Sequence, residues 1–350
     1  MLEIDGAVAA AWPDEGVAAH YGDPLREQRV AAERGALVDR SNRGVVAITG
    51  PDRLSWLHSL TSQHLERLAP GRCAQALILS PQGHLEHHLT LTDDGTTVWA
   101  HVEPGTAPAL VAYLNSMRFM LRVEVADLSA THGVLSFLSV TELADSPALA
   151  DFPSLAGVMA VTRGSLGLDM VVDLDLIGEV AGKLEVSAAG LWAYEAARIA
   201  AHVPRPGVDT DHKTLPHEAG LIEAAVHLNK GCYRGQETVA RVHNLGHPPR
   251  RLVLLHLDGG ADRLPAHGAP IVDPEGREVG FVGSAALHYE LGPIGLGLVK
   301  RTAPTGATLL ADGVAAAQEV IVAPDAGGAV KVALRRDSVP QPPAAARKLI

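Results

Sequence analysis

Residues 229–247 hold the densest set of chemically capable side chains in the sequence, NKGCYRGQETVARVHNLGH. Gly231 and Gly235 flank Cys232, and glycine permits backbone conformations and close ligand approaches that other residues prevent. The segment 226–251 has five basic residues and one acid, although the whole chain has a net charge of −11. Because arginine pairs readily with carboxylates, this local excess favours an anionic small molecule as ligand.

Cys232 is the candidate reactive group of this segment. It lies between Lys230 and Arg234, and neighbouring cations favour the thiolate form of a cysteine. The alternative is a small buried apolar residue, which is a common role for a lone cysteine. The only other cysteine is Cys73, and the sequence has no CxxC pair. A zinc or cluster site built from this chain's own thiolates is therefore not expected.

The elements that must position this segment follow from the apolar periodicity and the turn residues. Strands are predicted at 45–49, 73–80, 85–92, 96–102, 123–127, 134–140, 167–173 and 183–187, and helices at 52–65, 108–120, 191–201 and 219–225. The part of the chain before residue 248 is thus mixed α and β, with a surface loop expected at 141–156.

The pattern of predicted elements changes after Pro248 and Pro249. Short strand candidates at 251–257, 270–272, 277–283, 295–300 and 319–322 are separated by Gly, Pro and Asp, which predicts a small β-barrel or sandwich. The expected organisation is a region 1–247, a barrel over 248–335 and a disordered tail over 336–350.

Composition limits the classes of function. A length of 350 residues with 47% hydrophobic residues predicts two or three domains with a sizeable core. No apolar run approaches the ~18 residues of a membrane span, and the first ten residues lack the basic start of a secretory signal. A cytoplasmic protein without a membrane partner is expected. The net charge of −11 argues against direct contact with nucleic acid.

The sequence KGCYRGQE resembles the signature of the YgfZ folate-binding family, which typically reads KGCYxGQE. Over residues 28–310 the chain also resembles the glycine-cleavage T-protein aminomethyltransferase fold. This resemblance implies an α+β fold of two intertwined subdomains around a central site, followed by a small β-barrel. It also implies an accessory protein that binds tetrahydrofolate or a derivative and supports iron–sulfur cluster assembly or repair. Its partners would be a reduced folate and either iron–sulfur enzymes or cluster-assembly proteins, and no conventional enzymatic turnover is expected.

The resemblance also implies roles for single residues. Glu195 corresponds to a family glutamate that accepts hydrogen bonds from the pterin ring, whereas without the resemblance an exposed helical glutamate is the ordinary interpretation. The resemblance implies that the motif residues 230–237 form a loop beside the folate site. Cys232 corresponds to the thiol on which the family's function depends, without being proven catalytic. The other expected ligand-binding or loop-supporting residues are Asn42, Lys230, Tyr233, Arg234, Gln236, Glu237 and Arg241.

One departure from the aminomethyltransferases concerns their chemistry. Those proteins carry an acidic pair in a sequence like GGIIDDL, which assists the amine chemistry at folate N5. The corresponding positions here are His87 and His88, and Glu86 is one residue out of register, which in a strand places it on the opposite face. Transferase chemistry is therefore expected to lack its carboxylate. His84 adds a third histidine, but no fourth ligand accompanies them, so no metal site is expected.

Two alternatives remain open from the sequence. The first is a true folate-dependent enzyme, either an aminomethyltransferase or a demethylase, and the histidine pair is the feature that argues against it. The second is a tRNA-modification factor that acts indirectly, through iron–sulfur-dependent modification enzymes. The acidic net charge disfavours direct RNA contact.

Overall fold

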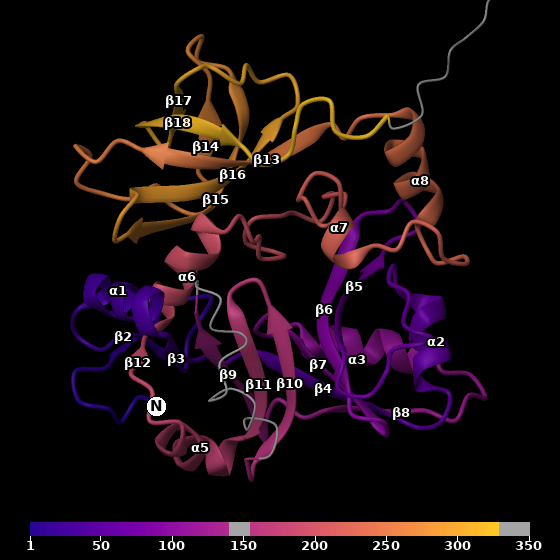
Figure 1. Ribbon diagram of the computed structural model, residues 1–350. Coiled ribbons are helices and arrows are strands. Elements are labelled where there is room, and N and C mark those ends of the chain that lie inside the picture. The colour runs from indigo at the N-terminus through magenta and orange to yellow at the C-terminus, as the bar shows by residue number, and fades with distance from the viewer. Residues whose placement is uncertain (140–154, 329–350) are drawn as a thin grey trace, which may run out of the picture.

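The computed structural model describes residues 1–139 and 155–328 and has a body built on two five-stranded sheets, with a six-stranded closed barrel above it (Figure 1). The predicted α+β fold with a C-terminal small β-barrel is confirmed. The predicted tail at 336–350 lies outside the described residues, as does all of the predicted loop at 141–156 except its last two positions.

The first sheet has the strand order β10-β11-β9-β3-β12. Its strands are β3 (Ala36–Asp39), β9 (His132–Leu138), β10 (Val158–Gly164), β11 (Gly167–Asp173) and β12 (Ala188–Ala189). Strand residues alternate between the two faces. One face, with Leu37, Phe137 and Met170, packs on α5 (Ile177–Lys183), which follows a 3-10 turn at Leu174–Leu176. The other face carries polar residues toward the second sheet.

The second sheet is antiparallel, in the order β5-β6-β7-β4-β8. Its strands are β4 (Gly44–Thr49), β5 (Cys73–Leu79), β6 (Leu85–Asp93), β7 (Thr97–Val102) and β8 (Glu124–Asp127). Helices α2 (Arg53–Leu60) and α3 (Ala107–Ser116) cover its outer face through Leu57 and Leu110, in the largest apolar core. On the inner face, Val45 and Trp99 pack against Val134 of the first sheet. The two sheets therefore face each other.

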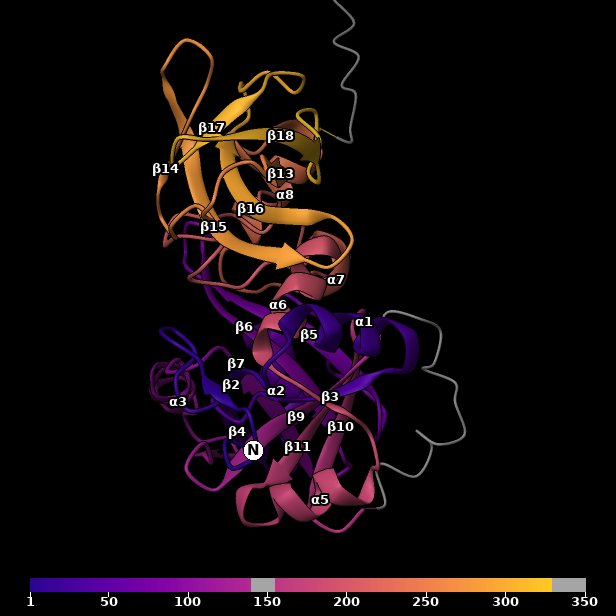
Figure 2. The same cartoon turned by 90° about the vertical axis from the view of Figure 1, so that its left-hand side faces the viewer.

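The barrel closes in the order β13-β16-β15-β14-β17-β18. Its strands are β13 (Arg250–Leu257), β14 (Pro270–Val272), β15 (Glu278–His288), β16 (Gly292–Lys300), β17 (Leu309–Ala311) and β18 (Val314–Val320). Its outer residues Leu252 and Leu296 pack on Ile199 of α6 (Leu191–Ala200). Helix α6 therefore lies between the barrel and the body, as both views show (Figures 1 and 2).

Five further elements complete the body. A short ribbon of β1 (Val8–Ala9) and β2 (Ala18–His20) precedes α1 (Pro24–Arg34), whose first turn is capped by the Asp23 carboxylate. Helices α7 (Ile222–Ala225) and α8 (Gln236–Leu245) pack on the end of β5 through Ala225 and Val239. The motif segment connects these last two helices, so the fold attaches it to the second sheet.

The structure corrects three local expectations. The helix predicted at 52–65 ends at Leu60, because Thr61 is extended and its hydroxyl donates to the Leu57 carbonyl at 2.8 Å. The strand predicted at 183–187 is wrong, since those residues follow α5 and strand pairing begins only at Ala188. The motif loop is shorter than predicted, because Gln236 and Glu237 already belong to α8.

Candidate functional site

A polar cavity of about 300 Å³ lies between the two sheets, below α6. Its walls come from β5 and β6 of the second sheet, β9 and β11 of the first, α6, and the loop 203–206. The side chains that line it include Arg40, Arg43, Gln75, His88, His101, Glu103, Ser136, Asp169, Tyr194, Arg198 and Arg205. The fold thus brings together charged residues that are far apart in the sequence.

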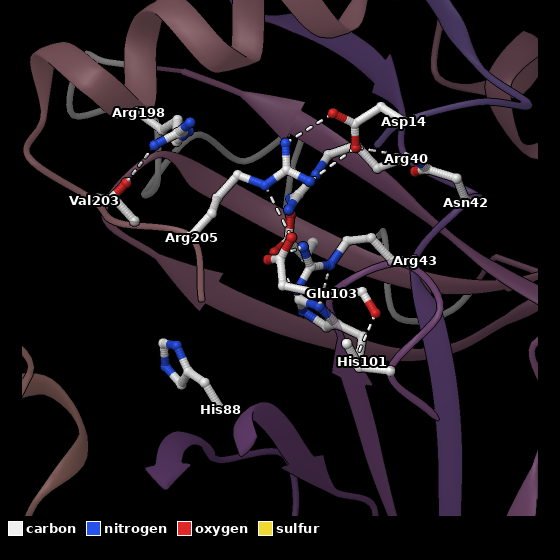
Figure 3. Close-up of polar contacts among 12 residues, drawn as sticks. Asp14, Arg40, Asn42, Arg43, His88, His101, Glu103, Arg198, Val203 and Arg205 are labelled. Carbon is white, nitrogen blue, oxygen red and sulfur yellow. Dashed lines mark hydrogen bonds and ion pairs between the residues drawn. The ribbon is translucent and has the colours of Figure 1, made fainter. Parts of the chain in front are cut away.

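Arg205 is the centre of the ion-pair network in this cavity (Figure 3). Its two terminal nitrogens donate to the two Asp14 oxygens at 2.8 Å each, and its Nε donates to Glu103 at 2.9 Å. Glu103 also accepts from Arg43 at 2.7 Å. Burial alone raises the pKa of Glu103, but Arg43 and Arg205 outweigh burial and hold that pKa well below its ordinary value. Glu103 is therefore an ionised acceptor.

Asp169 is a second partly buried carboxylate of the cavity. Its Oδ1 accepts from Arg40 at 3.1 Å and from the Ser136 hydroxyl at 2.5 Å, and its Oδ2 lies 3.3 Å from His101 Nε2. Although burial raises it, the pKa of Asp169 is held well below its ordinary value, above all by Arg40. The Arg40 guanidinium lies 3.8 Å from the centre of the Tyr194 ring, which fixes that ring in the wall.

Glu195 lies on α6, at the end of the same network. Its oxygens lie 2.6 Å from Arg198 and 3.3 Å from Arg205. Burial opposes ionisation, but these two arginines lower the pKa of Glu195 to about 2. Glu195 itself lines a second, more apolar hollow of about 450 Å³, together with Trp12 and Trp192, whereas its partners Arg198 and Arg205 line the central cavity. Glu195 is therefore a shielded, ionised acceptor and not an exposed helical glutamate.

Asn42 joins the network from the turn between β3 and β4. Its side-chain amide donates to Asp14 Oδ1 at 3.2 Å. This contact connects Asn42 indirectly to Arg205, which binds the same carboxylate (Figure 3).

The histidines of β6 take different directions. His88 faces the cavity and pairs with Gln75 at 2.9 Å, and burial lowers the pKa of His88 to about 4. The His87 ring lies instead 6.3 Å from the ring of Tyr113, on the outer side of the sheet. Glu86 is left out of the strand pairing by a bulge and binds Arg234. Of the two histidines that replace the acidic pair of the aminomethyltransferases, His88 is therefore the one that faces the cavity.

The motif segment is held by its own basic residues. Lys230 is buried and its Nζ donates to the carbonyls of His58 and Thr61, while burial lowers the pKa of Lys230 to about 8. The Lys230 Nζ lies 5.0 Å from the centre of the Tyr233 ring, and Gln236 accepts from the Tyr233 amide at 3.3 Å. These contacts fix the loop, and Cys232 projects from it as an exposed free thiol.

The basic residues of 226–251 have separate interactions. Arg234 bonds the Leu79 carbonyl and Glu86, and Arg250 pairs with Asp211 and Glu218. Arg251 is buried against the barrel, where it bonds Gln318. Arg241 and Glu237 lie on the exposed side of α8. Most basic side chains of this segment therefore make structural contacts, and they do not form a single anion-binding site.

Several cavity residues were not singled out from the sequence: Arg40, Arg43, Glu103, Asp169, Arg198 and Arg205. One signal for Asp169 was available, because a charged residue inside the apolar strand GLDMVVD needs a buried partner. No comparable local signal marks Glu103 or Arg205, whose partners come from distant segments. Among the described residues, no helix is long and apolar enough to cross a membrane.

Fold and site together define a T-protein-like α+β protein with a charged central cavity. Residues 250–335 match the family model of the glycine cleavage T-protein C-terminal barrel domain. The solved aminomethyltransferase T of the glycine cleavage system from Bartonella henselae has the same fold, with a TM-score of 0.75 at 22% identity over 91% of this chain and 94% of that chain.

Curated relatives fall into more than one group. An iron–sulfur cluster assembly factor IBA57 homolog from Mycosarcoma maydis, described as mitochondrial, is 27% identical over 61% of this chain and 55% of its own length. A chloroplastic protein from Arabidopsis thaliana is 25% identical over 76% of this chain and 66% of its own length. The chain thus spans less than two-thirds of either relative. An aminomethyltransferase from Parasynechococcus marenigrum is 26% identical over 79% of this chain and 82% of its own length.

Proposed function

We propose that this protein is a YgfZ-type accessory factor that binds a reduced folate beside Glu195, between the apolar hollow and the central cavity, and supports iron–sulfur cluster assembly or repair in other proteins. The observation that carries the proposal is the exposed thiol of Cys232, presented by a loop whose two cations, Lys230 and Arg234, are engaged in other contacts. The sequence similarity to an iron–sulfur cluster assembly factor points to the same function.

The carboxylate of Glu195 fits the ring system of a folate. A pterin offers an amino group beside a ring N–H, and ionised Glu195 can accept both, because each carboxylate oxygen has capacity for a second hydrogen bond. The cavity arginines already pair with carboxylates, so the cavity suits an uncharged polar heterocycle better than an anion. When bound, a reduced folate supplies an amine at N5 that can carry one-carbon groups.

The remaining motif residues have supporting parts in this proposal. Lys230, Tyr233 and Gln236 hold the loop that presents the thiol. Arg241 is the motif arginine for which the described part of the chain provides no ion pair, which leaves it free for the carboxylate tail of a folate. Glu237 lies exposed in the first turn of α8, where the helix dipole stabilises a negative charge.

His88 separates this proposal from aminomethyl transfer. With a pKa lowered to about 4, the imidazole is neutral at physiological pH and supplies no carboxylate to the cavity. The carboxylates that do line the cavity, Glu103 and Asp169, are held ionised by arginines and therefore cannot donate a proton.

Binding of tetrahydrofolate to the full chain tests the first half of the proposal. Wild type should bind, and Glu195→Gln should bind about 10- to 100-fold more weakly, because a hydrogen bond to a charged acceptor contributes about 1.5–3 kcal/mol. Cys232→Ala should bind like wild type. Wild type that does not bind, or Glu195→Gln that binds as tightly, would contradict the pterin assignment.

The second half of the proposal is tested in cells. A strain with Cys232→Ala in place of wild type should lose activity of its iron–sulfur enzymes, and His212→Ala, an exposed position outside the cavity and the motif, should serve as the control. Normal enzyme activity in the Cys232→Ala strain would overturn the role of the thiol, even if folate binding is intact.

A folate-dependent aminomethyltransferase is the second candidate. The fold likeness to a solved aminomethyltransferase over 91% of this chain favours it. The purified protein would then convert tetrahydrofolate and an aminomethylated lipoyl carrier protein into methylene-tetrahydrofolate, ammonia and the dihydrolipoyl carrier protein. We expect no turnover, and measurable turnover that His88→Asp increases would favour the transferase.

A further inference from the structure

Three side chains of types that bind metal ions, two imidazoles and one carboxylate, lie close together next to the motif segment and outside the central cavity. His58 lies in the last turn of α2, and His64 and Glu66 follow in the connection to β5. One ligand atom from each of these three residues lies within 4.8 Å of the other two. None of them is fully buried, so an ion can reach the group from solvent.

A third imidazole borders the group. The ring centroids of His58 and His64 are 4.6 Å apart with the planes at 78°, and His227 lies 5.3 Å from His64 with the planes at 51°. With metal–nitrogen bonds of about 2.0–2.1 Å and tetrahedral angles, two imidazoles on one ion have centroids roughly 5 Å apart. The observed spacings and the non-parallel planes therefore fit shared coordination better than stacking.

The backbone fixes this arrangement. Helix α2 ends at Leu60, Ser62 N–H donates to the Leu77 carbonyl at 2.9 Å, and Leu65 is fully buried. The chain therefore turns so that His64 lies back over His58. The His227 N–H donates to the Ser62 carbonyl at 2.9 Å, which brings the segment before the motif to the same place.

Imidazole and carboxylate ligands together select divalent transition metals such as Zn²⁺, Co²⁺ or Fe²⁺, whereas Ca²⁺ and Mg²⁺ prefer oxygen ligands alone. We propose that His58, His64 and Glu66 bind one divalent transition-metal ion, with His227 beside the remaining coordination position. The His58 ring accepts only a long hydrogen bond, from the Leu65 N–H to Nδ1 at 3.3 Å, which metal coordination can replace at little cost.

The position of the site gives it a connection to the motif. Lys230 Nζ donates to the carbonyl of His58 itself, and His227 is five residues before Cys232. An ion bound here would join the end of α2 to the segment before Lys230. The proposal does not depend on folate binding or on the thiol, because all three ligands lie outside both.

Titration of the metal-stripped full chain with Co²⁺ tests the site. Wild type should bind about one equivalent and develop the visible absorption bands of Co²⁺ held by nitrogen and oxygen ligands, and Zn²⁺ should displace it. His64→Ala and His58→Asn should each weaken binding by at least about 100-fold. His212→Ala removes an exposed histidine elsewhere and is the matched control.

The Cys232→Ser variant distinguishes this site from metal capture by the thiol. It should bind Co²⁺ like wild type, without change in the spectrum. Absence of Co²⁺ bands in wild type, equal binding by His64→Ala, or loss of binding in Cys232→Ser would each overturn the proposal. Because no client protein or folate takes part, failure here is separate from failure of the proposed function.

Discussion

Arg205 and Glu103 form an ion pair, 2.9 Å long, between the loop after α6 and the end of β7. The pair joins residues 102 positions apart in the chain. Arg205 also binds Asp14 from the N-terminal segment, so one guanidinium connects three segments that approach the central cavity. Figure 3 shows this arrangement, in which the carboxylates surround the arginine.

Glu103→Gln should lower the free energy of unfolding by about 2–3 kcal/mol, because it removes charge-assisted hydrogen bonds to both Arg43 and Arg205. The loss stays below that of an isolated buried pair, since Arg205 keeps Asp14. Urea denaturation followed by circular dichroism measures the change. Glu179→Gln, which breaks the exposed pair with Lys183, is the control and should leave the midpoint unchanged.

Glu195 should make stability depend on acid. Its pKa is about 2 in the folded protein against an ordinary value of 4.5, so in this window the unfolded state binds more protons. Stability from this group is therefore fully present above pH ~4.5 and is lost as the pH falls toward 2. Between pH 5 and 3, the free energy of unfolding should fall less steeply with pH in Glu195→Gln than in wild type. The two slopes should differ by up to about 1.4 kcal/mol per pH unit, the value for one proton. Equal slopes in the two proteins would contradict the ion pairs assigned to Glu195.

Gly235 should tolerate no side chain. Its φ is +82°, and an added Cβ would lie 2.5 Å from the Ser80 carbonyl oxygen. Gly235→Ala should therefore lower the free energy of unfolding by at least about 1–2 kcal/mol, from the left-handed conformation alone. Gly231→Ala is the matched control in the same motif, because nothing lies within 4 Å of its added Cβ. Thermal denaturation of the two variants side by side should show a large loss for the first and nearly none for the second.

Cys232 should react faster than Cys73 with a thiol reagent. Cys232 is exposed, whereas Cys73 is partly buried and its Sγ lies 3.5 Å from the Arg163 carbonyl oxygen. Titration of native protein with a chromogenic disulfide should give a fast phase that Cys232→Ser removes and Cys73→Ser leaves intact. A fast phase that survives in Cys232→Ser would show that the motif loop shields its thiol.

Part of the fold follows directly from local pattern. The strands at 45–49, 73–80 and 85–92 appear as β4, β5 and β6, because apolar alternation and the intervening turn residues act over short distances. The strand predicted at 183–187 fails for the opposite reason. Leu184 and Val186 are apolar because they pack beside α5, and tertiary packing satisfies them without strand pairing.

The sequence alone determined the α+β class, the C-terminal barrel and the motif around Cys232, because these depend on residue types and spacing along the chain. The tertiary structure decided which charges meet. Lys230 binds backbone carbonyls, and Arg234 binds Glu86. His88 faces the cavity, whereas His87 does not. Arg205 pairs with both Asp14 and Glu103. The fold also brings His58, His64 and Glu66 together next to the motif segment. Such partnerships depend on distances between segments remote in sequence, which only the folded chain defines.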